Sequence, residues 1–249
     1  AECTCRGIML CMSFGHFFKK KEKKRIYLDY AAATPIRSEV LSVMQKCLKN
    51  VFGNASAVHS EGSEAKRILE DARLRLARTL KIRPHGIVFT GNGTESNNLA
   101  MYGLLRRLVA LGKKFEEMEI ITTPLEHPSV YEVMKHLQEL GVRVHMCEVG
   151  EDGLVNTKQL QSLLNERTVL VTCAYVNSEI GVVQDVKRIA RIVKQFNTEQ
   201  KTEIKVHVDG AQAPLWLPCQ FDALGVDMLS LDAGKCYGPK GVGVLAMRH

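Results

Sequence analysis

Strand-like and helical segments alternate along the chain from Arg25 onward, and this alternation constrains the fold more than any other feature. Short apolar runs alternate with longer stretches whose apolar residues recur at helical spacing. This order predicts an α/β domain with a mostly parallel sheet and helices on both faces. We expect strands at 87–90, 120–123, 142–149, 169–175, 204–208, 228–231 and 242–247, and helices at 37–48, 65–80, from 94, 128–140, 157–164 and 186–196.

Composition places the chain among ordinary globular proteins. Of its 249 residues, 45% are hydrophobic and 24% charged, and no apolar run approaches the roughly 18 residues that span a bilayer. Much of the net charge of +7 lies in the basic run 19–25, and no nucleic-acid motif follows it. The eight cysteines show neither C-x-x-C pairs nor metal-ligand spacing. We therefore expect a cytoplasmic protein with reduced thiols, no metal, no membrane or nucleic-acid partner, and an extension at 1–25 outside the fold.

Ligands of parallel α/β sheets bind beyond the carboxyl ends of the strands, so the loops there are the candidate site. In the segment 90–98, Gly93 and Thr94 stand where a helix begins, and free N–H groups and the helix dipole favour an anion there. A simple helix cap explains the same residues. His127 stands between a strand and a helix, where it could stack on a planar ring or exchange protons, although a lone histidine is more often structural.

Two further strand ends carry an acid and an amine. Asp209 ends the apolar run 204–208, where a carboxylate is costly to bury without a partner. A pyridinium N–H would be such a partner, and metal ligation or a helix cap explains Asp209 equally well in isolation. Lys235 follows the run 228–231, where an amine can lose its proton and attack a carbonyl. A single lysine is more often solvated, so the argument for Lys235 depends on its combination with the other strand-end residues.

Together these segments resemble the class V aminotransferase group of fold-type I pyridoxal 5'-phosphate (PLP) enzymes, and most closely the cysteine desulfurases. The resemblance implies a PLP-binding large domain over 26–249. It is carried by YLDYAAATP at 27–35, GNASAVH at 53–59, FTGNGTESNN at 89–98, EHP at 126–128, NSEIG at 177–181, HVDGAQA at 207–213 and KCYGPKGVG at 235–243.

The resemblance also implies a role for each site residue. Lys235 would form the Schiff base with PLP and later move the substrate's α-proton, while His127 would stack on the ring and assist proton transfer. Asp209 would pair with the ring nitrogen. The remaining implied contacts are Asn177 and Gln212 with the ring's phenolic oxygen, and Gly93, Thr94 and the positions of Asp232 and Gly234 with the phosphate.

Two features depart from the family pattern. Where members usually read Ser-Gly-His-Lys, this chain has Asp232, Ala233, Gly234 and Lys235. An acid at 232 would repel a phosphate dianion unless it is protonated or turned away, so we expect weakened or rearranged phosphate binding. The chain also stops where the family's large domain closes, so we expect the small C-terminal domain, with its nucleophilic cysteine, to be absent. Cys236 is expected to be a packed thiol.

The implied reaction turns L-cysteine into L-alanine and passes the sulfur on for iron–sulfur cluster or thio-cofactor assembly. We expect that activity to be incomplete in this chain. The implied partners are the amino acid, a sulfur-acceptor protein such as an iron–sulfur scaffold, and a second copy in a homodimer. Two alternatives remain open: a related lyase or aminotransferase, such as a selenocysteine lyase, and a non-catalytic PLP-binding scaffold. A dinucleotide-binding domain is disfavoured because no strand is followed by G-x-G-x-x-G.

Overall fold

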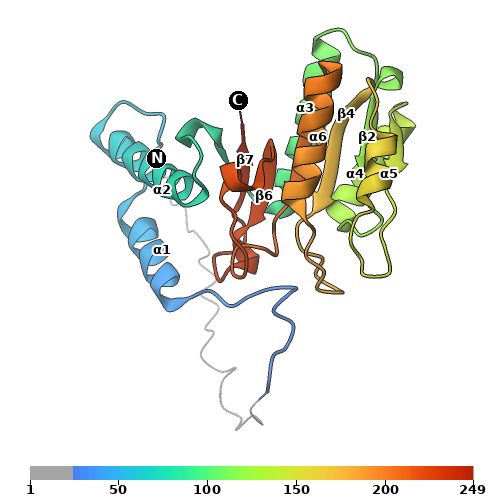
Figure 1. Cartoon of the computed structure of the whole chain (residues 1–249). Helices are drawn as coiled ribbons and strands as arrows, with labels where there is room; N and C mark the ends of the chain where they lie inside the picture. Colours follow the sequence, from blue (N-terminus) through green and yellow to red (C-terminus); the bar gives the residue numbers. More distant parts are fainter. Residues whose placement is uncertain (1–24, 249) are drawn as a thin grey trace, which may run out of the picture.

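The computed structural model describes residues 25–248, which form one seven-stranded sheet flanked by helices (Figure 1). The strand order is β1-β7-β6-β5-β4-β2-β3. The pairs from β6 to β3 are parallel, whereas β7 is antiparallel to both β1 and β6. The predicted α/β class with a mostly parallel sheet is therefore confirmed. The strands are β1 (Ile87–Thr90), β2 (Glu119–Thr122), β3 (Arg143–Met146), β4 (Thr168–Ala174), β5 (Lys205–Asp209), β6 (Met228–Asp232) and β7 (Gly243–Met247).

Helices cover both faces of this sheet and divide its apolar side chains into two cores. One core joins the sheet to α3 and α4, and the other joins it to α2, α5, α6 and α7. The helices are α1 (Ser38–Asn50), α2 (Ser60–Leu80), α3 (Gly93–Ala110), α4 (Pro128–Glu139), α5 (Thr157–Leu163), α6 (Val186–Gln200) and α7 (Phe221–Leu224), with 3₁₀ turns at Pro84–Gly86, Phe115–Glu117 and Ala233–Lys235.

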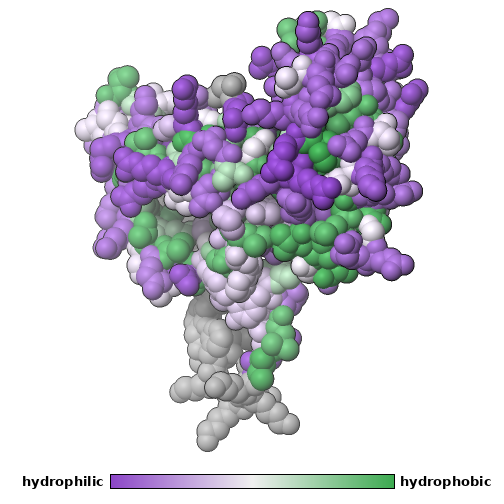
Figure 2. Space-filling view, in the orientation of Figure 1, coloured by the Kyte–Doolittle hydropathy of each residue, from purple (hydrophilic) through white to green (hydrophobic). Residues whose placement is uncertain are grey.

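The helix α6 illustrates how sequence pattern sets these layers. Its buried residues recur at helical spacing: Val186, Ile189, Ala190 and Val193. Its other face is charged and polar, and Figure 2 shows mainly hydrophilic residues over this part of the molecule. The side chain of Asp185 caps the helix by accepting a hydrogen bond from the N–H of Arg188 at 3.1 Å.

The strand β4 lies inside the sheet, and all seven of its residues are buried. Its sequence is a nearly continuous apolar run rather than an alternating one, as expected for a parallel strand covered on both faces.

Polar side chains on the central strands form hydrogen bonds with each other. His207 of β5 contacts Thr172 Oγ1 through Nδ1 at 2.8 Å and Ser230 Oγ through Nε2 at 2.9 Å. Burial lowers the pKa of His207 to about 3, so this histidine is neutral and structural.

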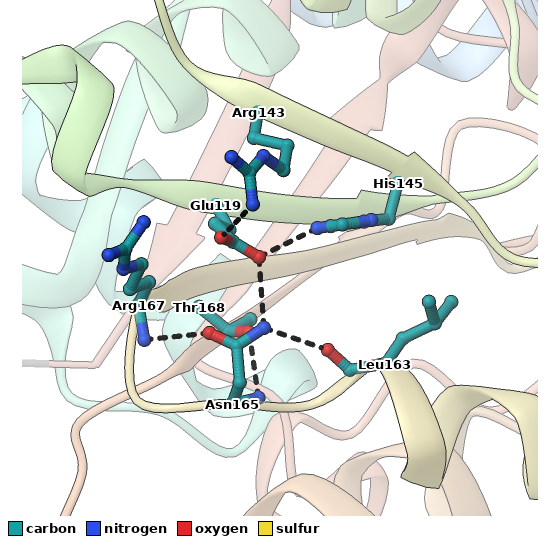
Figure 3. Close-up of polar contacts among 7 residues, drawn as sticks. All are labelled: Glu119, Arg143, His145, Leu163, Asn165, Arg167 and Thr168. Carbon is teal, nitrogen blue, oxygen red and sulfur yellow. Dashed lines mark hydrogen bonds and ion pairs between the residues drawn. The ribbon is translucent and has the colours of Figure 1, made fainter.

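A buried carboxylate, Glu119, forms a polar network at the end of the sheet where the parallel strands begin; Figure 3 shows the residues of this network. Glu119, which is 4% exposed, begins β2. Its carboxylate lies 3.2 Å from Arg143 Nη1 and 2.7 Å from His145 Nε2, and it accepts a 2.9 Å hydrogen bond from Asn165 Nδ2. Burial opposes ionisation, but the hydrogen bonds from Asn165 and His145 outweigh it and lower the pKa of Glu119. This network fixes β2, β3 and the loop before β4.

Several predicted bounds differ from the structure. The strand expected at 142–149 ends at Met146, the helix expected at 65–80 begins at Ser60, and the helix expected at 186–196 continues to Gln200. The short helix α7 was not predicted. The expected extension at 1–25 lies outside the described residues except for Arg25, so the domain boundary at 26 remains a prediction. Within residues 25–248, no helix is both long and apolar enough to cross a bilayer.

Candidate active site

A cavity of about 840 Å³ opens where the central parallel strands end. Ala174, Asp209 and Asp232 end β4, β5 and β6, and all three line it. The first turns of α3 and α4 complete its wall, so it lies where a parallel sheet is expected to bind a ligand. All nine predicted site residues line this one cavity: Gly93, Thr94, His127, Asn177, Asp209, Gln212, Asp232, Gly234 and Lys235.

The amine of Lys235 is held by backbone carbonyls. Lys235 ends the 3₁₀ turn Ala233–Lys235 directly after β6, and its Nζ donates to the carbonyl oxygens of Ala31 at 2.9 Å and Ala32 at 2.7 Å. The side-chain amide of Gln212 donates to the same Ala31 oxygen at 2.9 Å. The loop around Ala31 therefore forms one wall of the cavity against the lysine.

Thr34 fixes this loop to the turn that carries the lysine. It is 2% exposed, and both its N–H and its hydroxyl donate to the Gly234 carbonyl, at 3.0 and 2.9 Å. Its hydroxyl in turn accepts from the N–H of Tyr237 at 2.7 Å, and its carbonyl accepts from Lys240 Nζ at 2.7 Å. Segments about 200 positions apart in the sequence are thereby joined at the site.

The carboxylate of Asp209 is buried and doubly held at the end of β5. The residue is 8% exposed. Its Oδ1 accepts from the N–H of Ala211 at 3.0 Å, and its Oδ2 accepts from Asn97 Nδ2 at 2.8 Å. Asn97 lies in the second turn of α3 and is 1% exposed. These two donors fix the orientation of the Asp209 side chain at the cavity.

The same amide connects Asp209 to His127. Asn97 Nδ2 also donates to Ser129 Oγ at 2.9 Å, and Ser129 Oγ lies 2.8 Å from His127 Nδ1. The N–H of Ser129 donates to this Nδ1 at 3.1 Å. Because a backbone N–H can only donate, Nδ1 is the acceptor, and the proton of the neutral imidazole lies on Nε2. This hydrogen-bond chain therefore fixes both the position and the tautomer of His127.

Glu126 places a second carboxyl group beside Asp209. Its Oε1 accepts from Thr123 Oγ1 at 2.6 Å and from the N–H of Ala174 at 3.0 Å, and Ala174 pairs with Asp209 in the sheet. Its Oε2 is buried and has no hydrogen-bond partner within residues 25–248. Burial raises the pKa of Glu126 to about 8, and the charge of Asp209 adds to the effect. The carboxyl group of Glu126 is therefore mainly protonated at pH 7.

The acid at position 232 points into the amino end of α3. Its Oδ2 accepts from the N–H of Gly93 at 2.8 Å, and its Oδ1 accepts from the N–H of Gly234 at 2.7 Å. The N–H of Gly93, one of the groups expected to hold a phosphate, is thus paired with a side chain. The next residue of the helix, Thr94, lines the cavity, and Asn92 caps the helix by accepting from the N–H of Glu95 at 2.8 Å.

Asn177 lines the cavity, and its side-chain amide forms hydrogen bonds with the backbone of the surrounding loops. Its Nδ2 donates to the Leu125 carbonyl at 3.0 Å, and its Oδ1 accepts from the N–H groups of Glu179 and Ile180. These bonds connect the loop after β4 to the loop that carries Glu126. The predicted contacts of Asn177 and Gln212 with a ring oxygen remain predictions, because both amides serve the chain itself.

The thiols near the site are neutral. Burial raises the pKa of Cys147, Cys219 and Cys236 to about 11. Cys236 follows Lys235, and its Sγ donates to the Asp232 carbonyl at 3.2 Å, as expected of a packed thiol. In the part of the chain that the structure describes, no group of three His, Cys, Asp or Glu side chains could hold a metal ion.

Four contributors to the site were not assigned from sequence: Asn97, Glu126, Ser129 and the carbonyls of the loop at Ala31. All four fall within or beside the motifs, and Asn97 stands four positions after Gly93, which is about one helical turn. That spacing is the one signal that could have indicated Asn97. The position of the Ala31 loop had no such signal.

Comparison with known proteins shows which family the chain is similar to. The sequence profile of the class V aminotransferases matches residues 26–249. The cysteine desulfurase IscS of Dictyoglomus turgidum is 38% identical over 226 residues, which are 91% of this chain and 55% of that protein. A mitochondrial cysteine desulfurase of Eremothecium gossypii is 38% identical over 225 residues, which are 90% of this chain and 44% of that protein. The chain thus spans about half the length of the curated relatives it matches.

Solved structures show the same fold. A NifS-like protein has a TM-score of 0.84 at 36% identity, covering 90% of this chain and 59% of its own. SspA in complex with cysteine has a TM-score of 0.81 at 36% identity, covering 90% of this chain and 61% of its own. The profile match over nearly the whole described region, together with these relatives, shows that the chain belongs to the class V aminotransferase family.

Proposed function

We propose that this chain binds PLP through Lys235 and forms the cofactor-binding part of a cysteine desulfurase, which converts L-cysteine to L-alanine and passes on the sulfur. The family is PLP-dependent, and the relatives are named cysteine desulfurases. The observation that carries the proposal is the single cavity lined by Lys235, Asp209 and His127 from three different elements.

The cavity suits the cofactor ring at the end where Asp209 lies. The volume of the whole cavity, about 840 Å³, falls in the range of small-molecule sites. The Asp209 carboxylate is held from two sides by Asn97 and Ala211, and a ring N–H is the kind of partner that a buried carboxylate at a strand end requires. The end at Asp232 is less suited to the cofactor's phosphate, because the N–H of Gly93 already donates to the Asp232 carboxylate.

Each side chain then has a definite task. PLP, when bound, supplies an electron-withdrawing ring that stabilises negative charge at the α-carbon of an amino acid. Asp209 would hold the ring nitrogen, and the raised pKa of Glu126 keeps a second negative charge away from this part of the cavity. Lys235, whose Nζ lies on the Ala31 and Ala32 carbonyls, would hold the cofactor and exchange the α-proton. His127, which lines the cavity, would stack on the ring and assist proton transfer.

Substrate, partners and compartment belong to the same proposal. L-cysteine is favoured because a structural relative is described in complex with cysteine. A sulfur-acceptor protein and a second copy of the chain are the proposed partners. Within residues 25–248 the cysteines are free thiols, which supports a cytoplasmic, reducing environment.

Borohydride trapping tests the proposal. The chain is mixed with PLP, reduced, digested and analysed by mass spectrometry, and the pyridoxyl mass is expected on Lys235. Lys235→Ala should abolish the adduct. Lys240→Ala is the matched control, because Lys240 lines the same cavity while its amine contacts the Thr34 carbonyl. Labelling of Lys240 in place of Lys235 would refute the assignment. Formation of L-alanine from L-cysteine is then measured with and without added reductant.

A further inference from the structure

The carboxylate of Asp232 occupies the place where α3 would bind an anion. Its two oxygens accept short hydrogen bonds from the N–H groups of Gly93 and Gly234, at 2.8 and 2.7 Å. Gly93 begins an 18-residue helix, so the helix dipole adds to the attraction. We call these three residues the Asp232 cap. Charge-assisted hydrogen bonds of this length are among the stronger ones in proteins, so the chain itself satisfies this anion site.

The two glycines of the Asp232 cap make room for the acid. A Cβ atom at position 234 would lie 3.1 Å from Asp232 Oδ1, and one at position 93 would lie 3.3 Å from Oδ2. Both distances are tighter than ordinary contact. The departures from the family pattern at 232 and 234 are therefore one arrangement, because a larger side chain at 234 would press on the carboxylate.

Within residues 25–248, no ion pair involves the Asp232 carboxylate. The nearby amines of Lys235 and Lys240 donate instead to the carbonyls of Ala31, Ala32 and Thr34. The negative charge therefore remains at this end of the cavity, where it repels a second anion.

We propose that Asp232 takes the place of the cofactor phosphate at α3, so that the phosphate contributes little to the affinity of this chain for the pyridoxal ring. The inference rests on the proposed binding of PLP. It assigns Asp232 as a specificity-determining residue: with the Asp232 cap formed, PLP and unphosphorylated pyridoxal bind with similar dissociation constants. Removal of the carboxylate frees the N–H groups of Gly93 and Gly234 for phosphate.

The first test compares two ligands that differ only in the phosphate. Dissociation constants for PLP and pyridoxal are measured by absorbance for the wild type and for Asp232→Ser, Asp232→Asn and Asp185→Ser. Asp185 is the matched control because it also caps a helix and does not line the cavity. The pyridoxal-to-PLP ratio of dissociation constants should be near one for the wild type and the control. It should rise about ten- to a hundredfold in both Asp232 variants.

Asp232→Asn keeps the side-chain shape and removes the charge, so it separates repulsion from a change in packing. A wild type that already prefers PLP by tenfold or more would overturn the inference while supporting the proposed function. An unchanged ratio in both Asp232 variants would overturn it as well.

A second test does not need the pyridoxal ring. Thermal unfolding is followed in inorganic phosphate and in chloride at equal ionic strength. Phosphate should raise the Tm of Asp232→Ser and leave the wild type and Asp185→Ser unchanged. If neither ring ligand binds any variant, the proposed function fails, and the phosphate experiment still decides whether Asp232 occupies an anion site. Equal stabilisation of the wild type and Asp232→Ser by phosphate would refute the inference.

Discussion

Asn97 holds the Asp209 carboxylate through a 2.8 Å hydrogen bond from Nδ2 to Oδ2 and uses its second amide hydrogen on Ser129. The carboxylate can only accept, so this bond fixes the orientation of the amide, and Asn97 Oδ1 has no hydrogen-bond partner within residues 25–248. One side chain on α3 thereby positions both the acid of β5 and, through Ser129, the imidazole of His127.

Asn97→Ala should therefore weaken both fold and site. Loss of the Asn97 amide leaves the buried Asp209 carboxylate with one hydrogen-bond donor fewer. The free energy of unfolding is therefore expected to fall by about 1–3 kcal/mol. The dissociation constant for PLP should rise about tenfold as Asp209 loses its orientation. Asn98→Ala is the control, since Asn98 Nδ2 bonds to the Thr94 carbonyl on the same helix. Urea denaturation and a PLP titration measure both effects, and equal PLP affinities in the two variants would contradict the positioning role.

Because burial raises the pKa of Glu126, the free energy of unfolding should fall as the pH rises. Its pKa is raised from 4.5 to about 8 by burial, so the native state retains a proton that the unfolded state releases. The contribution is fully present below about pH 4.5, declines by about 1 kcal/mol per pH unit above it, and levels off beyond about pH 8. Glu126→Gln should flatten this decline. Urea denaturation between pH 5 and 9 tests it, with the exposed Glu151→Gln as control, which should keep the wild-type slope.

The seven strands and their mainly parallel order could be predicted from the sequence because buried parallel strands are continuous apolar runs. The fully buried β4 is an example. The edge strand β3 was predicted too long, because apolar residues continue at Cys147 and Val149 although pairing with β2 ends at Met146. The four-residue helix α7 has too few positions for helical periodicity to be detected.

The site was predictable to the extent that strand ends determine it. Parallel strands end at one edge, so Asp209 and Lys235 were expected to converge. Their hydrogen-bond partners were not predictable, because the contact of Lys235 with the Ala31 carbonyl joins positions 204 apart. For Asp232 the sequence indicated repulsion of phosphate. The direction of its carboxylate, toward the N–H of Gly93, depended on the packing of β6 against α3.

Glu119 should stabilise the fold without affecting the site, because its network (Figure 3) lies where the parallel strands begin and the site lies where they end. Its lowered pKa means that its contribution is present above the unfolded pKa of about 4.5 and is lost as the pH falls. Glu119→Gln should cost about 2 kcal/mol at pH 7, and less at pH 4, because three partners lose a charged acceptor. Denaturation at both pH values measures this, with PLP affinity expected to stay within twofold of the wild type. A loss of stability that is equal at the two pH values would contradict the ionic assignment.

Positions 232 and 234 should be energetically coupled. Gly234→Ala places a Cβ 3.1 Å from Asp232 Oδ1, so it should lower the free energy of unfolding by about 1 kcal/mol. In the Asp232→Ser background the crowding oxygen is gone, and the same substitution should cost nothing or stabilise slightly by restricting the unfolded chain. A double-mutant cycle from urea denaturation gives the coupling energy, expected at about 1 kcal/mol. Gly103→Ala, on an open part of α3 where a Cβ meets nothing within 4 Å, is the control and should stabilise both backgrounds equally. Additive effects of the changes at 232 and 234 would show that the two positions are not energetically coupled.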